Sequence, residues 1–247
     1  MNIDKELVNL NDFKKIFCNK KLLQLIINQE AINEICPVFM YNSFNPKMDF
    51  CDTKIFGENK ILEVPRNFMT LFGFPQYGIH CNAWCKKKMS FLMHFAIRSK
   101  KLSYFPGLHD NLIAGGQPVG ISILKNFQKE AVEEAGLKKI NFRKLLKSST
   151  TNYSHEHKKK IHSGIIFTYH YEVSEKKKFI NTDGEVDNFI SYDISNIYKI
   201  LESKLLKPNC IIPIADFFLT ISNDFFPKKS ILELKRIMNK NGRSTQS

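Results

Sequence analysis

The sequence predicts a mixed α/β fold, and three observations carry that prediction. Residues 110–137 combine a glycine-rich loop with an amphipathic helix that ends at Gly136. Residues 78–85 alternate in polarity, and residues 161–173 are rich in β-branched and aromatic side chains, which favours strands. An apolar run over residues 211–221 indicates a helix packed on the core. Helical and extended segments therefore alternate along one chain.

The first part of the chain is expected to form a small unit of its own. Apolar residues recur at helical spacing through residues 4–35, and a Cys-Pro pair ends that stretch because the residue before a proline is pushed out of the helical region. Residues 38–63 are short extended segments separated by Asn, Pro, Asp and Gly, which indicates a small sheet. We therefore predict a small N-terminal α+β domain over residues 1–76 and a main domain over residues 77–247.

In the main domain, strands are expected on both sides of the glycine-rich loop and its helix. Residues 86–99 are expected to pair with residues 78–85 as a hairpin. His155, His157 and His162 stand at irregular spacing in a polar context, so we expect surface histidines there and no metal site. The remaining predictions are strands at 140–147 and 161–173, a polar loop at 150–160, an acidic loop at 181–189, and helices at 193–205 and 227–238.

Charge and hydropathy exclude several classes of protein. The 247 residues carry a formal net charge of +13, with 43% hydrophobic and 25% charged residues, which is the balance of a globular protein with a sizeable core. No apolar run reaches the length of a membrane span, and the N-terminus lacks the features of a signal or transit peptide, so we expect a cytoplasmic protein with no membrane partner. The lysines fall in short clusters without interleaved aromatic residues, which favours a solvated surface over a nucleic-acid interface. The six cysteines are dispersed, so we expect reduced, structural thiols.

The acidic helix carries the chemistry. Glu130, Glu133 and Glu134 stand at spacings i, i+3 and i+4, so a helix places them on one face. Adjacent carboxylates repel one another, and a bound cation would relieve that repulsion; hard oxygen ligands suit Mg²⁺ or Mn²⁺. An acidic helix face by itself is more often simply solvated. The metal-site interpretation therefore depends on the glycine loop before the helix and on the glycine that ends it.

With those additions the stretch resembles the Nudix box, the motif G-x5-E-x7-R-E-U-x-E-E-x-G-U of the Nudix hydrolases, in which U is aliphatic. Gly115 matches the first glycine, Lys129 and Glu130 match the R-E pair, and residues 133–137 match the end of the motif. Ile121 stands where the first glutamate is expected, and Lys129 replaces the arginine. In the family the first glutamate is mainly a structural partner, so these departures bear on loop geometry and rate more than on metal binding.

Three further pieces narrow the resemblance. GIHCNAW, RSKKLSYFPGLHDNLIAGGQPVGIS and LLKPNCIIPIADFFL are similar to ordered motifs of the subgroup related to thiamine pyrophosphokinase-associated Nudix proteins. This resemblance covers nearly the whole chain and implies an α/β/α Nudix sandwich with a small N-terminal α+β domain. It also implies hydrolysis of thiamine diphosphate, or of damaged analogues such as oxothiamine and oxythiamine diphosphate, to the monophosphate and phosphate, as metabolite damage repair. No residue independently specifies thiamine.

The candidate site residues follow from this resemblance and from the geometry of the strand and the helix. We expect Glu130, Glu133 and Glu134, with the backbone of Gly115 and Gly116, to hold metal; Glu134, Glu133 and Glu185 to act in catalysis; and Arg98, Lys101, His80, Asn82 and Trp84 to contact substrate. His80, Asn82 and Trp84 alternate along one strand, so they share a face on which a flat ligand could stack. The alternatives are a core position for Trp84 and a plain turn around Glu185.

The sequence therefore predicts an enzyme: a Mg²⁺- or Mn²⁺-dependent hydrolase of a small-molecule diphosphate, acting as a monomer or homodimer. One alternative on the same fold is hydrolysis of a nucleoside diphosphate derivative. Isomerisation of isopentenyl diphosphate is another, although no catalytic cysteine matches the expected loop. From a different class, the chain could be a basic RNA-binding protein with a degenerate box, which Ile121 favours and the intact glutamates oppose.

Overall fold

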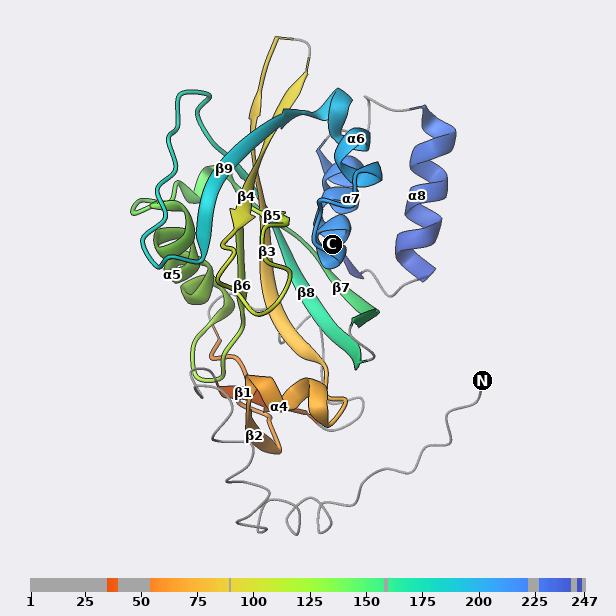
Figure 1. Cartoon of the computed structure of the whole chain (residues 1–247). Coiled ribbons are helices and arrows are strands. Elements are labelled where there is room, and N and C mark those ends of the chain that lie inside the picture. The colour runs from red at the N-terminus through yellow and green to blue at the C-terminus, as the bar shows by residue number, and fades with distance from the viewer. Residues whose placement is uncertain are drawn as a thin grey trace.

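The computed structural model describes residues 35–39, 54–88, 90–157, 160–221, 227–240 and 244–245. The helices predicted from residue 4 onward lie outside the described residues. Two antiparallel strands, β1 (Ile35–Val38) and β2 (Leu62–Pro65), form a small sheet at one end of the molecule (Figure 1). The predicted small sheet is present, but its strands lie at the two ends of the predicted stretch 38–63, and the described residues 54–61 between them form turns and bends.

The main sheet has the strand order β10-β7-β8-β3-β4-β5, with β6 also paired to β3 and β9 also paired to β4. Among the described strands, β3 and β8 run parallel and the other neighbours are antiparallel. The strands are β3 (Gln76–Lys86), β4 (Phe91–Arg98), β5 (His109–Asn111), β6 (Ile113–Gly116), β7 (Leu145–His157), β8 (Lys160–Glu172), β9 (Val186–Asp193) and β10 (Ser244–Thr245). The pairing of β3 with β4 confirms the predicted hairpin.

Helices cover both faces of this sheet. They are α4 (Arg66–Leu71), α5 (Ile123–Ala135), α6 (Ile197–Glu202), α7 (Ile211–Thr220) and α8 (Lys228–Lys240), with short 3-10 helices η1 (Phe142–Lys144), η2 (Ile194–Asn196) and η3 (Pro208–Cys210). Figure 1 shows α5 on one side of the sheet and α6, α7 and α8 on the other. The predicted α/β/α arrangement is therefore confirmed.

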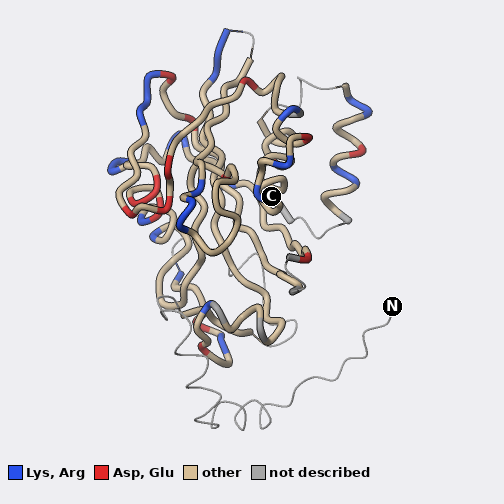
Figure 2. The backbone as a smooth tube through the Cα atoms, in the orientation of Figure 1, with Lys and Arg blue, Asp and Glu red and all other residues tan. Residues whose placement is uncertain are grey.

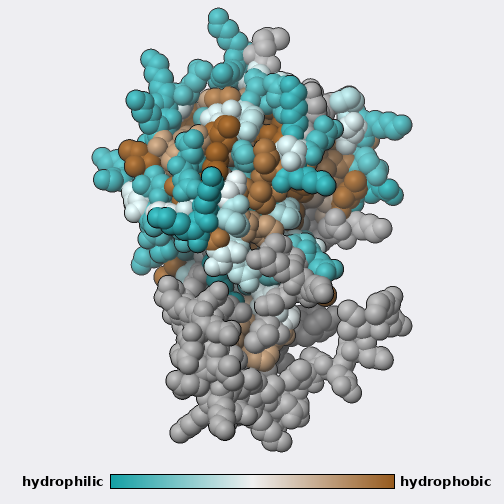
Figure 3. All heavy atoms as spheres, viewed as in Figure 1, coloured by the Kyte–Doolittle hydropathy of each residue, from teal (hydrophilic) through white to brown (hydrophobic). Residues whose placement is uncertain are grey.

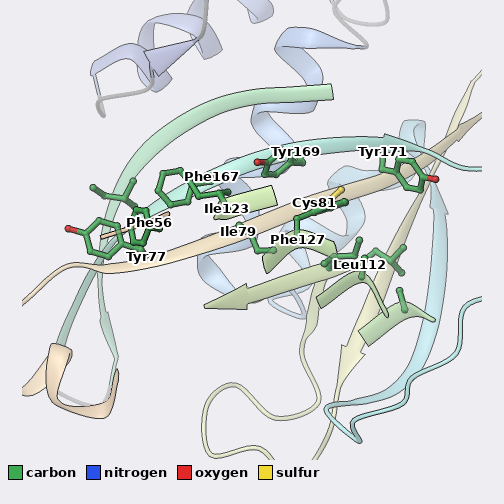
Figure 4. Close-up of a cluster of buried hydrophobic side chains, with 14 of the residues drawn as sticks. Phe56, Tyr77, Ile79, Cys81, Leu112, Ile123, Phe127, Phe167, Tyr169 and Tyr171 are labelled. Carbon is green, nitrogen blue, oxygen red and sulfur yellow. The ribbon is translucent and has the colours of Figure 1, made fainter. Parts of the chain in front are cut away.

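Strand β3 separates two hydrophobic cores, because its side chains alternate between the two faces of the sheet. Ile79 and Cys81 belong to the core under α5, where Phe127 of the helix is fully buried (Figure 4). Trp84 packs against the second core, under α7, beside Phe217. Burying a large apolar side chain contributes about 1.5–3 kcal/mol, so these two cores hold α5 and α7 firmly on opposite faces of one strand.

The described part of the predicted N-terminal domain shares the core under α5. Phe56 contacts Tyr77 of β3 and Phe167 of β8, with ring centroids 5.2 and 5.7 Å apart. Val64 of β2 and Met69 of α4 are fully buried in the same core. β2 and α4 thus pack directly against the main sheet, and the boundary after residue 76 stays a prediction.

Strand β7 is longer than the sequence predicts. The polar stretch at 150–160 was expected to be a loop, yet most of it extends β7, with Tyr153 opposite Gly164 and His155 opposite His162. Its polar composition is misleading because Tyr153, His155 and His162 line a polar cavity and do not face an apolar core. The preceding strand also starts later than predicted, at Leu145, after η1.

The C-terminal third differs from the prediction in its boundaries. The acidic loop ends before residue 186, because β9 pairs with β4 from there on. Asp193 caps the short helix η2, accepting a bond from the Ser195 amide, and α6 is shorter than the predicted helix at 193–205. Helices α7 and α8 confirm the predictions for residues 211–221 and 227–238 within two residues at each end.

The surface and the thiols agree with the sequence analysis where the structure describes them. The lysine clusters at 86–88, 138–139 and 176–178 are exposed, and Figure 3 shows hydrophilic side chains projecting around the rim of this face. The four described cysteines are buried thiols. Among the described helices, none has both the length and the apolar character needed to cross a membrane.

Candidate active site

Helix α5 begins and ends as its sequence requires. The Ser122 hydroxyl accepts a bond from the Lys125 amide at 3.2 Å, which satisfies one of the amides at the start of the helix. Gly136 ends it at a φ of +66°, where an added Cβ would lie 2.9 Å from the Ile180 carbonyl oxygen. Only glycine fits both the left-handed backbone and this close approach.

Of the three glutamates on this helix, Glu134 is the most buried. Its exposed fraction is 6%, and one of its carboxylate oxygens accepts the Ala114 amide of β6 at 2.7 Å. Burial raises the pKa of Glu134 well above its ordinary value, and the neighbouring charge of Glu130 adds to the effect. Figure 2 shows acidic residues gathered at α5 and at the segment entering β9. This carboxylate is therefore poised to bind either a proton or a cation.

Gly115 lets β6 approach the acidic face of α5. A Cβ at this position would lie 2.2 Å from the carboxylate carbon of Glu130, a separation that no side chain could tolerate. Gly116 has a different role. Its carbonyl oxygen accepts a hydrogen bond from the buried side-chain amide of Asn126 at 2.7 Å, which ties the loop to the helix. Of the two glycines predicted at the metal, the close-approach role belongs to Gly115.

Lys129 occupies the space beside the glutamates. Its ammonium nitrogen lies 3.1 Å from an oxygen of Glu130 and 2.9 Å from an oxygen of Glu133. Burial opposes its charge, but these two carboxylates outweigh that effect and raise the pKa of Lys129 above its ordinary value. The lysine that replaces the arginine of the motif therefore neutralises part of the acidic face.

The loop before α5 is held without the first glutamate of the motif. The side-chain amide of Gln117 donates to the carbonyl oxygens of Pro118 and Ile121, each at 3.1 Å. The Ile121 carbonyl also accepts the Phe56 amide at 3.2 Å. Because backbone groups and Gln117 fix the loop, Ile121 does not need to supply a carboxylate.

Glu185 lies where the sequence analysis expected an additional acid. Its amide is bonded to Asp183 at 2.9 Å in the turn before β9, and both side chains line the cavity that contains the acidic face. The turn is fastened to the end of α5, where the Thr182 amide donates to the Glu133 carbonyl at 2.8 Å. Glu185 is therefore both part of a turn and part of the site.

The cavity has a volume of about 990 Å³ and brings together residues from distant parts of the chain. Glu130, Glu133, Glu134 and Glu185 are on its wall. These residues fit a divalent cation: the oxygen donors are hard ligands, and the buried Glu134 carboxylate lies within the field of like charges that a cation would offset.

A second charged group, which we call the Asp110 cluster, consists of Arg98, Asp110, Lys207 and Cys210. The Asp110 carboxylate accepts Arg98 at 2.9 Å and Lys207 at 2.8 Å through one oxygen. Its other oxygen accepts the Cys210 thiol at 2.7 Å. Burial alone would raise the pKa of Asp110, but the charge of Lys207 leads the effects that hold the pKa well below its usual range.

Arg98 and Lys207 line the cavity, so the Asp110 cluster brings positive charge into the same cavity as the acidic face. The sequence analysis included Arg98 but missed Lys207, because no local pattern connects it to Asp110, which lies 97 residues away. The arginine is committed to structure: its Nε and Nη2 donate to the Tyr104 carbonyl at 3.2 and 3.0 Å. Arg98 therefore binds both Asp110 and the Tyr104 carbonyl of the loop before β5.

His80, Asp110 and Cys210 offer ligand atoms within 4.8 Å of one another, a pattern that can hold a metal ion. Here the charge of Asp110 is already balanced by Arg98 and Lys207, and a further cation would lie against both of them. Burial, followed by the charge of Lys207, lowers the pKa of His80 to about 4. We therefore interpret these three residues as a hydrogen-bonded network.

His80 and Asn82 are fixed inside that network. His80 Nδ1 lies 2.8 Å from the Asn111 side-chain oxygen, and Asn209 lies 3.4 Å from its Nε2. Asn111 donates to the Asn82 side-chain oxygen at 2.7 Å, and Asn82 donates to the Pro213 carbonyl at 2.7 Å. His80 still lines the cavity, whereas Asn82 does not, so the predicted substrate contact of Asn82 is not supported by its position.

Trp84 and Lys101 also lie away from the cavity. His80, Asn82 and Trp84 do share one face of β3, as predicted, but the tryptophan ring packs edge-on against Phe91 and Phe217, with centroids 5.3 and 5.6 Å apart. Trp84 is therefore not among the rings that a ligand in the cavity would meet. Lys101 is exposed and is not among the residues lining the cavity. The core interpretation of Trp84 is the one that the structure supports.

Other aromatic rings line the cavity and offer the stacking surface that was expected of Trp84. Tyr153, His155 and His162 of the β7–β8 hairpin line the cavity with Tyr104 and Phe105. The rings of His155 and His162 are stacked, with centroids 5.3 Å apart, and Tyr153 stacks on His155 at 5.8 Å. His162 is only 8% exposed. The prediction of surface histidines is therefore wrong for this pair, because the strand turns them inward.

Two plant proteins are similar in sequence to this chain. Nudix hydrolase 24, chloroplastic, of Arabidopsis thaliana is 28% identical over 163 residues, which are 66% of this chain and 45% of that protein. Nudix hydrolase 20, chloroplastic, of the same plant is 31% identical over 147 residues, which are 59% of this chain and 39% of that protein. No family model matches the chain. The matched region spans less than half the length of either relative, and the cytoplasmic location expected for this chain stays a prediction.

The fold has a counterpart among solved structures. The crystal structure of DR0079 from Deinococcus radiodurans superposes with a TM-score of 0.50, covering 74% of this chain and 99% of that one at 12% sequence identity. At that identity the likeness concerns the fold alone. The similarity to Nudix hydrolases comes from the two plant sequences, which agree with the resemblance of residues 110–137 to the Nudix box.

Proposed function

We propose that the chain is a divalent-metal-dependent hydrolase of a small-molecule diphosphate. The observation that carries the proposal is the meeting of four carboxylates, Glu130, Glu133, Glu134 and Glu185, on one cavity wall against the close backbone of Gly115. Carboxylates gathered in this way suit a cation, and a cation in turn suits the oxygens of a diphosphate. The similarity to two Nudix hydrolases supports the same reaction class.

In this proposal Glu130, Glu133 and Glu134 hold Mg²⁺ or Mn²⁺ from a rigid helix. When bound, such a cation offsets charge on phosphate oxygens and lowers the pKa of a water in contact with it. Lys129 is paired with Glu130 and Glu133, so it would have to release their carboxylates for these to hold a cation. Its exposed side chain can turn into solvent at little cost.

We assign proton transfer to Glu134. Glu134 lines the cavity beside the other glutamates, and burial raises the pKa of its carboxyl in the metal-free chain, whereas a bound cation would lower it. The Ala114 amide fixes one oxygen and leaves the other to face the cavity. Glu185, exposed at the cavity wall, is the alternative proton acceptor.

For the substrate we propose thiamine diphosphate or its oxidised and damaged analogues, on the strength of the sequence motifs. The aromatic wall of Tyr104, Phe105 and Tyr153 suits a planar heteroaromatic group, and rings of this kind contribute through stacking. The cavity volume of about 990 Å³ leaves room for such a group beside a diphosphate.

A substrate panel tests the proposal. Phosphate release is measured from thiamine diphosphate, oxothiamine diphosphate, oxythiamine diphosphate, ADP-ribose and nucleoside diphosphates, each with Mg²⁺, with Mn²⁺ and with EDTA. We expect metal-dependent turnover that is fastest for a thiamine analogue. Preference for ADP-ribose or a nucleoside diphosphate would reject the substrate class and keep the reaction. An absence of turnover on every compound, with salt-sensitive RNA binding, would reject the enzyme.

A further inference from the structure

We propose that Lys207 is the fixed cation that binds the phosphate group of the substrate farthest from the acidic face of α5. This proposal deepens the proposed function and rests on it for the identity of the ligand as a diphosphate. Its basis is separate: the position of Lys207 on the cavity wall and the buried carboxylate that holds it there.

The backbone around Lys207 is fixed by β5. The Lys207 amide donates to the His109 carbonyl at 2.9 Å, and the His109 amide donates to the Leu205 carbonyl at 2.7 Å. This short parallel bridge attaches residues 205–207 to the edge of the sheet. Pro208 then begins η3, where the Cys210 amide donates back to the Lys207 carbonyl at 3.0 Å. The lysine therefore projects from a rigid support.

The side chain is fixed as well. Asp110 is 3% exposed and accepts the Lys207 ammonium at 2.8 Å, while the Cys210 thiol and the Asn111 amide occupy its other oxygen. An ammonium has three N–H donors, and Asp110 takes one of them. Because the lysine lines the cavity with a side chain only 14% exposed, its remaining donors are held near the ligand with little rotational freedom to lose on binding.

The charge count favours an anion at this place. Arg98 and Lys207 bring two positive charges to the single negative charge of Asp110, so the Asp110 cluster carries one excess positive charge. Arg98 uses three of its five donors on Asp110 and Tyr104, and Lys207 uses one of its three on Asp110, so each keeps two N–H groups for an anion in the cavity. A phosphate there would form a charge-assisted hydrogen bond in a poorly solvated site.

The surroundings of Lys207 add neutral polar groups to the charge. Asn209, two residues later, contacts both the Tyr153 hydroxyl and His80, and all three line the cavity. His80 stays neutral at physiological pH because its pKa is about 4. A ligand that satisfies both walls therefore needs one anionic group for Lys207 and further anionic oxygens for cations at the glutamates, which a diphosphate supplies.

The test uses the full chain and three variants. Lys207→Gln removes the charge and keeps polarity, and Lys139→Gln removes an exposed lysine outside the cavity as a matched control. The double variant Asp110→Asn with Lys207→Gln removes one charge of each sign, so net charge is unchanged and the Asp110 carboxylate is not left without its lysine partner. Pyrophosphate binding is measured by isothermal titration calorimetry in EDTA and in Ca²⁺, and steady-state kinetics gives KM and kcat for the best substrate.

We expect Lys207→Gln and the double variant to weaken pyrophosphate binding by about 10- to 100-fold in EDTA, the range for loss of a charge-assisted hydrogen bond. KM should rise by a similar factor with a smaller change in kcat, and Lys139→Gln should match the natural chain. Folding of each variant is checked by thermal unfolding.

Unchanged pyrophosphate affinity and KM in a folded variant would overturn the proposal, as would failure of the natural chain to bind pyrophosphate in either condition. Hydrolysis with no dependence on Lys207 would reject this inference and leave the proposed function standing. Pyrophosphate binding that depends on Lys207, without hydrolysis of any substrate, would keep this inference and reject the proposed function.

Discussion

The acidic face of α5 and the Asp110 cluster share a cavity but are built in opposite ways. Glu130, Glu133 and Glu134 lie within five consecutive residues, and helix periodicity alone brings them together. The Asp110 cluster joins Asp110 to Lys207, which is 97 residues farther along the chain. The acidic face carries excess negative charge, which a cation would offset. In the Asp110 cluster the charge of Asp110 is balanced, and one positive charge is left over. In the proposed function, one cavity therefore binds a metal ion at the glutamates of α5 and an anion at Lys207.

The two regions also differ in how their buried carboxylates are stabilised. Burial, followed by the charge of Glu130, raises the pKa of Glu134, and the single backbone donor Ala114 offsets only part of that effect. Asp110 has two cationic partners and a thiol, so its pKa is held low in spite of its burial. A buried carboxylate with few donors is chemically responsive, whereas one with many is structural. Substitutions in each region test this contrast.

The largest effect is expected for Glu134→Gln. Loss of the ionisable group should lower kcat by about 10²- to 10⁴-fold, the usual contribution of a general base. The amide oxygen can still accept the Ala114 amide, so the fold is retained. Because the raised pKa of Glu134 costs stability as pH rises above 4.5, the metal-free variant should unfold at an equal or higher temperature at pH 8. Full activity in this variant would transfer the role of general base to Glu185.

Asp110→Ala should chiefly affect stability. It leaves Arg98 and Lys207, both 14% exposed at the side chain, without their shared counter-charge. We expect a loss of about 2–4 kcal/mol in the free energy of unfolding, as for other broken buried pairs. Urea unfolding at pH 7 measures it, with Glu202→Ala, an exposed carboxylate outside the cavity, as the control. A loss below about 0.5 kcal/mol would mean that the cluster does not hold this region together.

The third prediction concerns pH and His80. Its pKa is lowered to about 4 in the folded chain against 6.5 in the unfolded chain, so the unfolded state binds the additional proton between these values. Stability should therefore fall as pH drops from 6.5 to 4, by up to about 3 kcal/mol from this residue. His80→Gln should flatten the measured slope of unfolding free energy against pH. An unchanged slope would show that His80 is not neutral and buried as described.

A smaller effect is expected for Gly115→Ala. The added Cβ would lie 2.2 Å from the Glu130 carboxylate carbon, which must move away. We expect Mn²⁺ affinity, measured by electron paramagnetic resonance of the unbound ion, to fall about tenfold through misplacement of one ligand. Thermal unfolding of the variant in EDTA is the control for a general loss of the fold. Mn²⁺ affinity equal to that of the natural chain would mean that Glu130 does not hold the ion.

The smallest effect is expected for Lys101→Gln. Its exposed side chain lies outside the cavity, so KM should change by less than about twofold through long-range charge alone. This outcome, measured beside Lys207→Gln under the same conditions, separates a fixed cation from general positive charge. An equal rise of KM in both variants would favour the substrate contact first expected for Lys101.

Local sequence was sufficient wherever a short pattern determines geometry. Helix α5, its glycine stop and the hairpin of β3 with β4 were all predictable, because capping, periodicity and alternation act within a few residues. Polarity was misleading for the β7–β8 hairpin, since a strand that lines a polar cavity has no apolar face to reveal it. Trp84 was ambiguous for a related reason: alternation places it on one face of β3, and the packing of α7 decides what that face meets.

The acidic helix face follows from the amino-acid sequence alone, because helical spacing puts the three glutamates on one face and the flanking glycines act within a few residues of them. The rest of the cavity depends on tertiary structure. The docking of residues 205–207 against β5 brings Lys207 to Asp110, and the β7–β8 pairing turns an aromatic wall inward. Contacts between segments so far apart depend on how layers pack on a shared sheet, and no short stretch of sequence records that packing.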